Sequence, residues 1–380
     1  MITIQLHNLS IGYRGKHHTY PVATGLNASL HSGRLTCLLG ANGVGKSTLL
    51  RTLSAFLPPL EGSITLLNKP LEQYADKELA RALSVVLTER IDVPDLRVTD
   101  VVALGRTPYT GFLGGLNDTD EEQVRSALQA TGITHLAQRK LHTLSDGERQ
   151  KCMIAKALAQ DTPLIFLDEP TAFLDYPSTV EMMQLLHRLS RSMQKTIFLS
   201  THDLDLALQL ADCVWLLDAE GHLTTGLPES LMLDGTLPRF FRSEGVRFDP
   251  TTGHFSVVHR PTRPTELITT GTGLPLLMLR RVLQRQGFTI LNPEKSGQVS
   301  TAEAPCTPQA TEEFPRSTHP SATTAGLPIV TATTDASGHY RFTLTTSLHP
   351  TTQQHYPTLE ALIEALESYL HHHSSITYLE

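Results

Sequence analysis

Short apolar runs alternate with helical patterns over the first part of the chain, to about residue 250. Three of these runs, at 35–39 (LTCLL), 164–167 (LIFL) and 196–199 (TIFL), are apolar almost throughout, which is typical of strands buried on both faces. Strands that are separated by helices predict a mainly parallel sheet with helices on both faces. The pattern therefore indicates the α/β fold class.

A helical pattern dominates the chain between about residues 71 and 143. The acidic cluster at 118–122 (DTDEE) is typical of the first turn of a helix, because carboxylates are favoured at helix N-termini. We therefore expect a helical subdomain, inserted at about 71–143, within a first domain that covers residues 1–260.

Residues 261–380 change in character and predict a small α/β extension. Residues 292–327 are rich in Pro, Ser, Thr, Ala and Glu, which indicates a flexible insert. The four residues 335–338 (DASG) suit a hairpin turn between two alternating runs. The predicted elements are an amphipathic helix at 274–286, strands at 288–291, 329–334 and 340–346, and a helix at 358–371.

Length and charge restrict the possible classes of function. The chain has 380 residues, 40% hydrophobic and 18% charged, so it predicts a packed core in two or three domains of roughly 150 residues each. The formal net charge is -7 without a basic stripe, which argues against nucleic acid as a partner. Scattered cysteines favour reduced thiols over a disulfide frame or a zinc site; they are Cys37, Cys152, Cys213 and Cys306.

The sequence predicts neither a signal peptide nor a membrane span. Its first residues (MITIQLHNLS) lack the basic start and long apolar run of a secretory signal. Runs of about 18 apolar residues, the length that crosses a bilayer, do not occur. If the protein serves a membrane, we expect it to dock on one.

Candidate chemistry begins at residues 40–48 (GANGVGKST), which follow a predicted strand and open a predicted helix. This is the G-x-x-x-x-G-K-S pattern of a phosphate-binding P-loop, in which backbone N–H groups and the helix N-terminus surround phosphate oxygens. The alternative is a chance Gly-rich turn. We expect Lys46 to reach the outer phosphates and Ser47 to bind Mg²⁺. The predicted nucleotide-binding residues of this loop are Gly40, Asn42, Gly43, Val44, Gly45, Lys46, Ser47 and Thr48.

A pair of carboxylates follows the predicted strand at 164–167. Asp168 ends the strand and is predicted to hold Mg²⁺ beside the P-loop. Glu169 is predicted to polarise the attacking water as a general base. The alternative for both is a solvated acidic pair at the end of a strand.

Four further motifs resemble those of ABC transporter ATPases, in the same order along the chain. Residues 144–148 (LSDGE) resemble the ABC signature LSGGQ and open a predicted helix at 149–159. Asp175, in AFLD, resembles the D-loop aspartate, and His202, after the strand at 196–199, resembles the switch histidine near the γ-phosphate. Tyr13 resembles the aromatic residue that stacks on adenine. The alternative for Tyr13 and His202 is an ordinary surface position.

The resemblance covers about residues 1–258 and has implications for the fold, the cofactors and the partners. It implies an ABC-type P-loop NTPase fold with an added antiparallel β subdomain. It also implies ATP and Mg²⁺ as cofactors, with Lys46, Glu169 and His202 as catalytic residues. A head-to-tail homodimer would hold each ATP between the P-loop of one chain and Ser145 and Gly147 of the other.

In such proteins the dimer docks on integral-membrane permease subunits that work with an external substrate-binding protein. The resemblance therefore implies a place on the cytoplasmic face of the inner membrane. The predicted function is an ATP-hydrolysing subunit that energises a membrane importer. The alternative is a soluble ABC ATPase of translation or repair, although the chain has one P-loop and no sustained heptads.

The chain departs from the family pattern at three places. Asp146 and Glu148 replace the usual Gly and Gln of the signature, and two carboxylates near a triphosphate should weaken binding unless they point away. Thr88 occupies the position of the Q-loop glutamine; it is predicted to touch Mg²⁺ or its water, with Glu89 as the other candidate. The extension at 261–380 has no counterpart in simple importer subunits.

The subfamily and the extension allow narrower hypotheses. Residues 105–109 (GRTPY) are similar to a GR-x-PY stretch of importers for iron complexes such as siderophores or haem, and for cobalamin. The alternative is a Gly/Pro turn without substrate meaning. The extension could sense a small ligand, and the histidines at 371–373 could bind metal, but such a run is more often a solvated helix end.

Overall fold

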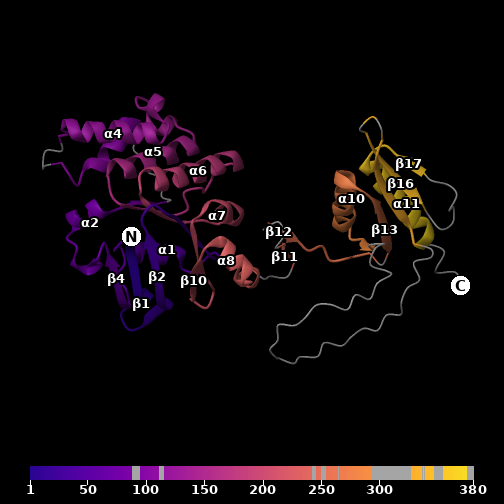
Figure 1. Ribbon diagram of the computed structural model, residues 1–380, viewed down its shortest axis with the longest axis horizontal. Helices are drawn as coiled ribbons and strands as arrows, with labels where there is room; N and C mark the ends of the chain where they lie inside the picture. The colour runs from indigo at the N-terminus through magenta and orange to yellow at the C-terminus, as the bar shows by residue number, and fades with distance from the viewer. Residues whose placement is uncertain are drawn as a thin grey trace. The chain divides into compact units, whose positions relative to one another are not determined.

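The computed structural model of the protein describes residues 1–87, 95–110, 115–241, 245–249, 254–263, 265–291, 327–335, 337, 339–345 and 354–374. The chain forms two compact units. The first comprises Met1–Arg242 and Phe248–Phe255, and the second comprises Ser243–Arg247 and Ser256–Glu380. Figure 1 shows both units as ribbons.

A six-stranded sheet forms the centre of the first unit, in the order β10-β9-β3-β8-β7-β6. All neighbours in it are parallel except β10, which runs antiparallel to β9. The predicted buried strands and the mainly parallel sheet are thereby confirmed. The bounds are β3 Leu35–Leu39, β6 Leu83–Val86, β7 Leu164–Leu167, β8 Thr196–Ser200, β9 Cys213–Leu217 and β10 Leu223–Gly226.

The continuous apolar runs arise because both faces of this sheet are covered. In β7, Ile165 and Leu167 join one hydrophobic cluster, while Leu164 and Phe166 join the other. Successive side chains of a strand point to opposite faces of the sheet. When both faces are buried, every position is apolar, and the alternation of apolar and polar residues is absent.

A four-stranded antiparallel sheet covers one face, together with helix α1 (Lys46–Leu53). Its strand order is β2-β1-β4-β5, and it confirms the expected antiparallel β subdomain. The cluster beneath it contains the fully buried Trp215, whose ring centroid lies 5.0 Å from that of Phe198. The strands are β1 Ile2–Arg14, β2 Thr19–His31, β4 Glu61–Leu66 and β5 Lys69–Pro70.

Helices cover the other face of the central sheet and form the helical part of the unit (Figure 1). The helix predicted to open at Asp118 does so, and Asn117 caps it. Between residues 71 and 143, however, β6 interrupts the helices as a strand of the central sheet. The helices are α2 Asp76–Ala82, α3 Val98–Ala103, α4 Asp118–Ala130, α5 Asp146–Ala159, α6 Tyr176–Ser192, α7 Leu204–Leu210, α8 Pro228–Leu233 and α9 Thr236–Phe240; 3-10 turns span Leu71–Gln73, Leu104–Arg106, Thr134–Leu136 and Leu141–Thr143.

The Gly-Arg-x-Pro-Tyr stretch is a buried clamp between helices. Arg106, which is 5% exposed, donates from Nε to the Asp120 carboxylate of α4 at 2.8 Å and from Nη1 to the Ala159 carbonyl of α5 at 2.8 Å. The ring centroid of Tyr109 lies 3.9 Å from its guanidinium carbon. Gly105 is required beside it, because a Cβ atom there would lie 2.2 Å from the Lys156 carbonyl oxygen. The stretch therefore has a structural role in this chain.

Replacing Arg106 with Gln should lower the free energy of unfolding by about 3–5 kcal/mol, because it leaves the Asp120 carboxylate buried without its cation. The Arg106 hydrogen bond holds the pKa of Asp120 below its ordinary value. The pair thus stabilises the fold above the ordinary carboxyl pKa, and this stabilisation is lost as the pH falls through the lower pKa of the folded state. Urea unfolding at several pH values measures both effects. Arg125→Gln, which breaks the exposed pair with Glu122, is the control and should lower the free energy of unfolding by less than about 1 kcal/mol. Equal losses of stability for the two variants would contradict the structural role of Arg106.

Helix α1 ends in a Schellman motif with alanine at the left-handed position. The N–H of Phe56 donates to the Arg51 carbonyl at 2.9 Å, and the N–H of Ala55 donates to the Thr52 carbonyl at 3.2 Å. Ala55 has φ 60°, a conformation that glycine adopts without steric cost.

The Ala55→Gly variant should therefore be more stable, by about 1 kcal/mol, because it removes the clash of Cβ in the left-handed region. Thermal or urea unfolding measures the change. Ala103→Gly is the control, since Ala103 has φ −61° and glycine there should destabilise by about 1 kcal/mol. A lower midpoint for Ala55→Gly would show that no strain is stored there.

The second unit is a small α/β fold with its own core. Its five-stranded sheet has the order β14-β13-β15-β16-β17, parallel between β14, β13 and β15 and antiparallel beyond. Buried residues such as Leu267, Leu283 and Phe342 form its centre. The bounds are β13 Glu266–Gly271, α10 Gly273–Arg285, β14 Thr289–Leu291, β15 Ile329–Thr334, β16 Tyr340–Thr345, β17 Gln354–Tyr356 and α11 Leu359–Ser374. Earlier in the chain, β11 Val246–Asp249 and β12 His254–Val257 form a two-stranded sheet, of which Phe248–Phe255 belong to the first unit.

The sequence predicted most of this unit. Both helices occur within a few residues of their predicted bounds, and Thr358 starts α11 by accepting from the N–H of Ala361. The two alternating runs form the predicted antiparallel pair β15 and β16. Strands β13 and β17 were not predicted. Residues 292–326 of the predicted flexible insert lie outside the described residues, as do the side chains of His371, His372 and His373.

Candidate nucleotide-binding site

The predicted P-loop lies between β3 and helix α1, at the carboxyl end of the central sheet. Gly45 precedes the helix with φ 111°, and a Cβ atom there would lie 2.2 Å from Val22 Cγ1, so only glycine fits. Lys46 Nζ donates to the carbonyls of Gly40 at 2.8 Å and Ala41 at 3.0 Å. The ammonium group is thus held across the mouth of its own loop.

The other predicted residues of the loop surround this lysine. Asn42, Gly43 and Ser47 are exposed, whereas Thr48 is buried in the first turn of α1. The hydroxyl groups of Tyr13 and Thr48 lie 3.1 Å apart, so β1 brings its aromatic ring to the P-loop helix. Tyr13 remains 47% exposed, and its ring is accessible to a flat ligand.

Carboxylates and hydroxyls meet where β7 and β8 end. Asp168 Oδ1 lies 3.3 Å from the Ser47 hydroxyl and 2.7 Å from the Ser200 hydroxyl. Ser200 also accepts a hydrogen bond of 2.9 Å from the N–H of Glu169. Ser200 therefore holds both Asp168 and Glu169 in place. The Ser47 hydroxyl, from α1, and the Asp168 carboxylate, after β7, converge on one point.

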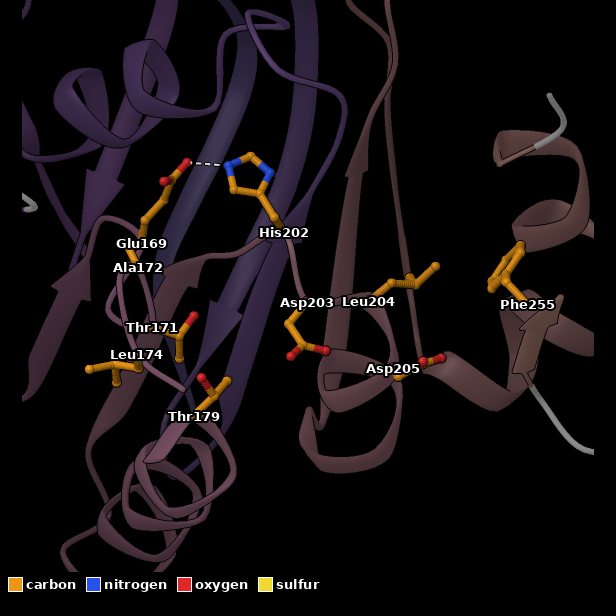
Figure 2. A pocket seen from close by; sticks show the side chains of 10 residues that line it. All are labelled: Glu169, Thr171, Ala172, Leu174, Thr179, His202, Asp203, Leu204, Asp205 and Phe255. Carbon is orange, nitrogen blue, oxygen red and sulfur yellow. Dashed lines mark hydrogen bonds and ion pairs between the residues drawn. The ribbon is translucent and has the colours of Figure 1, made fainter. Parts of the chain in front are cut away.

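Glu169 and His202 form a pair above this point. His202 Nε2 contacts Glu169 Oε1, as Figure 2 shows. Glu169 has φ 49°, an uncommon backbone conformation that marks functional turns. Asp203 holds the following helix by accepting from the N–H of Leu206, which fixes the segment that carries His202. The side chains of Glu169 and His202 are 30% and 45% exposed, so substrate can reach them.

Burial also affects the charge of the P-loop lysine. It lowers the pKa of Lys46, while the nearby carboxylates of Glu169 and Asp168 act in the opposite direction. The two carboxylates and the lysine thus share one electrostatic site.

The sequence 144–148 begins helix α5 with a reciprocal cap. Ser145 Oγ accepts from the N–H of Glu148 at 3.3 Å, and Glu148 Oε2 accepts from the N–H of Ser145 at 2.9 Å. These hydrogen bonds with Ser145 hold the pKa of Glu148 below its ordinary value. The helix therefore starts at Asp146, three residues before the predicted start. Glu148, one of the two carboxylates that depart from the family signature, therefore serves as a helix cap.

Gly147 and Asp175 lie together, beside the start of α6. A Cβ atom on Gly147 would lie 3.9 Å from both Leu174 and Ser178. Asp175 caps α6 by accepting from the N–H of Ser178 at 2.9 Å, and hydrogen bonds with Ser178 keep its pKa low. Residues 169–175 consequently connect Glu169 with the neighbourhood of Gly147.

Comparison with known proteins agrees with this arrangement. A sequence profile described as ABC transporter matches residues 23–172. An uncharacterized ABC transporter ATP-binding protein of Methanocaldococcus jannaschii is 34% identical over 277 residues, which are 72% of this chain and 94% of that protein. The chain belongs to the ABC transporter ATP-binding proteins. Members of this family hydrolyse ATP to power transport, and this chain is such an ATPase.

Two named relatives are similar over about three fifths of the chain. The petrobactin import ATP-binding protein FpuD of Bacillus anthracis is 39% identical over 60% of this chain and 84% of its own length. The ferric enterobactin transport ATP-binding protein FepC of Escherichia coli is 37% identical over 61% of this chain and 84% of its own. A solved dimeric ATP-binding cassette with ADP and Pi is 25% identical, covers 59% of this chain and 98% of its own, and has a TM-score of 0.52.

The ABC ATPase gathers most of its predicted site residues in one place. Tyr13, the P-loop, Asp168, Glu169 and His202 are linked by the contacts above, whereas the described hydrogen bonds of Ser145 stay within the start of α5. Thr88 and Glu89 lie outside the described residues. Sequence reasoning missed Ser200, although a serine at the end of a strand next to β7 was the available signal.

Proposed function

We propose that this ABC ATPase energises a membrane importer for iron complexes, such as ferric siderophores or haem, or for cobalamin. The observation that supports this cargo class is its similarity to proteins named for the import of petrobactin and ferric enterobactin. In the proposal, the ATPase docks on integral-membrane permease subunits at the cytoplasmic face of the inner membrane. An external substrate-binding protein supplies the cargo.

The proposed binding of nucleotide uses the P-loop and Tyr13. Backbone N–H groups of residues 40–48 surround the phosphates at the start of α1, where the helix dipole favours an anion. Lys46 releases the Gly40 and Ala41 carbonyls, 2.8 and 3.0 Å away, to donate to phosphate oxygens. The half-exposed ring of Tyr13 stacks on adenine.

The residues of the site also fit Mg²⁺. The Ser47 hydroxyl and the Asp168 carboxylate, 3.3 Å apart, are the hard oxygen ligands that this ion prefers. Bound Mg²⁺ would neutralise charge on the phosphates. Thr88, with Glu89 as the other candidate, stays a prediction from the sequence as a further contact to Mg²⁺ or its water.

The proposed hydrolysis uses Glu169 and His202. Glu169 accepts a proton from the attacking water as general base. His202, in contact with Glu169, orients this carboxylate and approaches the γ-phosphate. Ser200 keeps the Glu169 backbone in place through a hydrogen bond of 2.9 Å.

The proposed active species is a head-to-tail dimer. Ser145 and Gly147 lie at the N-terminus of α5, whose N–H groups suit an anion, yet they make no described contact with the P-loop of their own chain. A second copy would bring them to the γ-phosphate, and Asp175 would lie at the same interface. The similarity to a cassette solved as a dimer with ADP and Pi supports this assembly.

Uptake measurements test the cargo class. Cells that carry only the Glu169→Gln variant should lose uptake of one labelled cargo among a ferric siderophore, haem and cobalamin, while cells with the parent chain retain it. Cells with Glu181→Gln, which changes an exposed carboxylate of α6, are the matched control and should transport normally. Unchanged uptake of all three cargoes would reject the proposal.

A further inference from the structure

Two exposed tyrosines lie opposite each other in the hairpin of β1 and β2. In this antiparallel pair, Tyr13 is the direct partner of Tyr20. Side chains of directly opposed residues project from the same face of the sheet, with Cβ atoms about 4.5–5.5 Å apart. Tyr13 is 47% exposed and Tyr20 is 60% exposed. The proposed adenine contact therefore has a second aromatic side chain beside it, which the site described above does not use.

The shared face of this hairpin meets the P-loop and helix α1. From β1, the hydroxyl of Tyr13 lies 3.1 Å from that of Thr48 in the first turn of α1. From β2, Val22 packs against the P-loop so closely that a Cβ atom on Gly45 would lie 2.2 Å from its Cγ1. Tyr20 lies two positions before Val22 on the same strand. Its side chain is thus on the face that adjoins the proposed nucleotide site.

The ring of Tyr20 has room on this face because glycine occupies position 15. A Cβ atom on Gly15 would lie 3.2 Å from Tyr20 Cε2 and 3.0 Å from the His18 carbonyl oxygen. The N–H of Gly15 donates to the same carbonyl at 2.8 Å, which closes the end of the hairpin. A side chain at position 15 would displace either the ring or this turn. The local sequence therefore allows the Tyr20 ring to lie along the hairpin.

Packing of the two tyrosine rings against each other does not account for the pair. Within the part of the chain that the structure describes, the ring–ring contacts join other aromatic residues, and neither Tyr13 nor Tyr20 takes part in one. Cross-strand aromatic pairs usually stabilise their strands through such contact. Both rings consequently keep apolar surface open to a ligand, and covering this surface with another flat ring is favourable.

We propose that Tyr20 is a second aromatic contact for the nucleotide base, beside the Tyr13 ring on which adenine stacks. The proposal rests on the proposed nucleotide site and adds a residue to it. With the phosphates at the P-loop and the base on Tyr13, the ring of Tyr20 shields a further part of the base from water. Aromatic contacts of this kind add affinity for any base, because every base offers a π-face. The contact should therefore act on the base alone and not on the phosphates.

Calorimetric titration of the full-length chain with two ligands tests the proposal. In the Glu169→Gln background, which slows hydrolysis, Tyr20→Ala should weaken the binding of ATP with Mg²⁺ about fivefold or more. It should leave the affinity for inorganic tripolyphosphate with Mg²⁺ unchanged, because this ligand has phosphates but no base. Tyr20→Phe keeps the ring and should retain the parent affinity for both ligands. Tyr340→Ala, which removes a 46% exposed tyrosine of the second unit, is the matched control and should change neither affinity.

Three results would contradict the proposal, each in a different way. An affinity of Tyr20→Ala for ATP equal to that of the parent would overturn the second contact and leave the proposed nucleotide site intact. Equal losses for ATP and tripolyphosphate would also overturn it, because they would show that Tyr20 acts through the shape of the P-loop. A parent chain that binds neither ligand would instead overturn the proposed nucleotide site, and the contact of Tyr20 with it.

Discussion

The Glu169→Gln variant is expected to bind ATP normally and to hydrolyse it about a hundredfold to ten-thousandfold more slowly than the parent chain, which is the range for removal of a general base. Glutamine keeps the size of the side chain and the backbone N–H that donates to Ser200 at 2.9 Å. It lacks the basic oxygen that would accept a proton from water. Steady-state phosphate release with saturating ATP and Mg²⁺ measures the rate constant.

Glu181→Gln separates this effect from a general loss of carboxylate charge. Glu181 is 60% exposed on α6 and pairs only with Lys151 among its described contacts, so its replacement should leave the rate constant unchanged. An unchanged rate constant for Glu169→Gln would instead assign the base to another residue.

The Lys46→Ala variant should lose about tenfold to a hundredfold in affinity for ATP. A charged hydrogen bond to phosphate contributes about 1.5–3 kcal/mol, and every 1.4 kcal/mol changes a dissociation constant about tenfold. Its removal also leaves the Gly40 and Ala41 carbonyls without their donor, which loosens the loop. Titration with a fluorescent ATP analogue measures the change.

Lys77→Ala is the matched control, because Lys77 is an exposed lysine on α2. It should bind ATP as the parent does. Equal affinities for the Lys46→Ala variant and the parent would remove the P-loop from the account of nucleotide binding.

Local signals predicted the frame of this protein and much of its site. Apolar runs identified β3, β7 and β8 because both faces of the central sheet are buried. The spacing around Lys46 and the carboxylates after β7 identified the P-loop and its partner strand, because their chemistry depends on residues close in sequence. The cluster 118–122 gave the start of α4 for the same reason.

Contacts between distant segments were not readable from the sequence. Ser200 meets Asp168 across 32 positions, and Arg106 meets Ala159 across 53. The start of α5 at Asp146, by contrast, follows from the reciprocal cap between Ser145 and Glu148, whose Ser-x-x-Glu spacing is a local signal that the predicted start at residue 149 did not use. Phe255 lines the same cavity as His202 and lies on β12, a strand that the sequence pattern did not predict.

The described residues include no helix that is long and apolar enough to cross a membrane. What this ATPase binds in membranes tests most directly whether it powers a membrane transporter. The measurement is mass spectrometry of the proteins that co-purify with the Glu169→Gln chain, trapped with ATP and Mg²⁺ in solubilised native membranes. A polytopic permease, at stoichiometric amounts with the ATPase, is the expected result. Recovery of soluble ribosomal or repair proteins, without any permease, would contradict it.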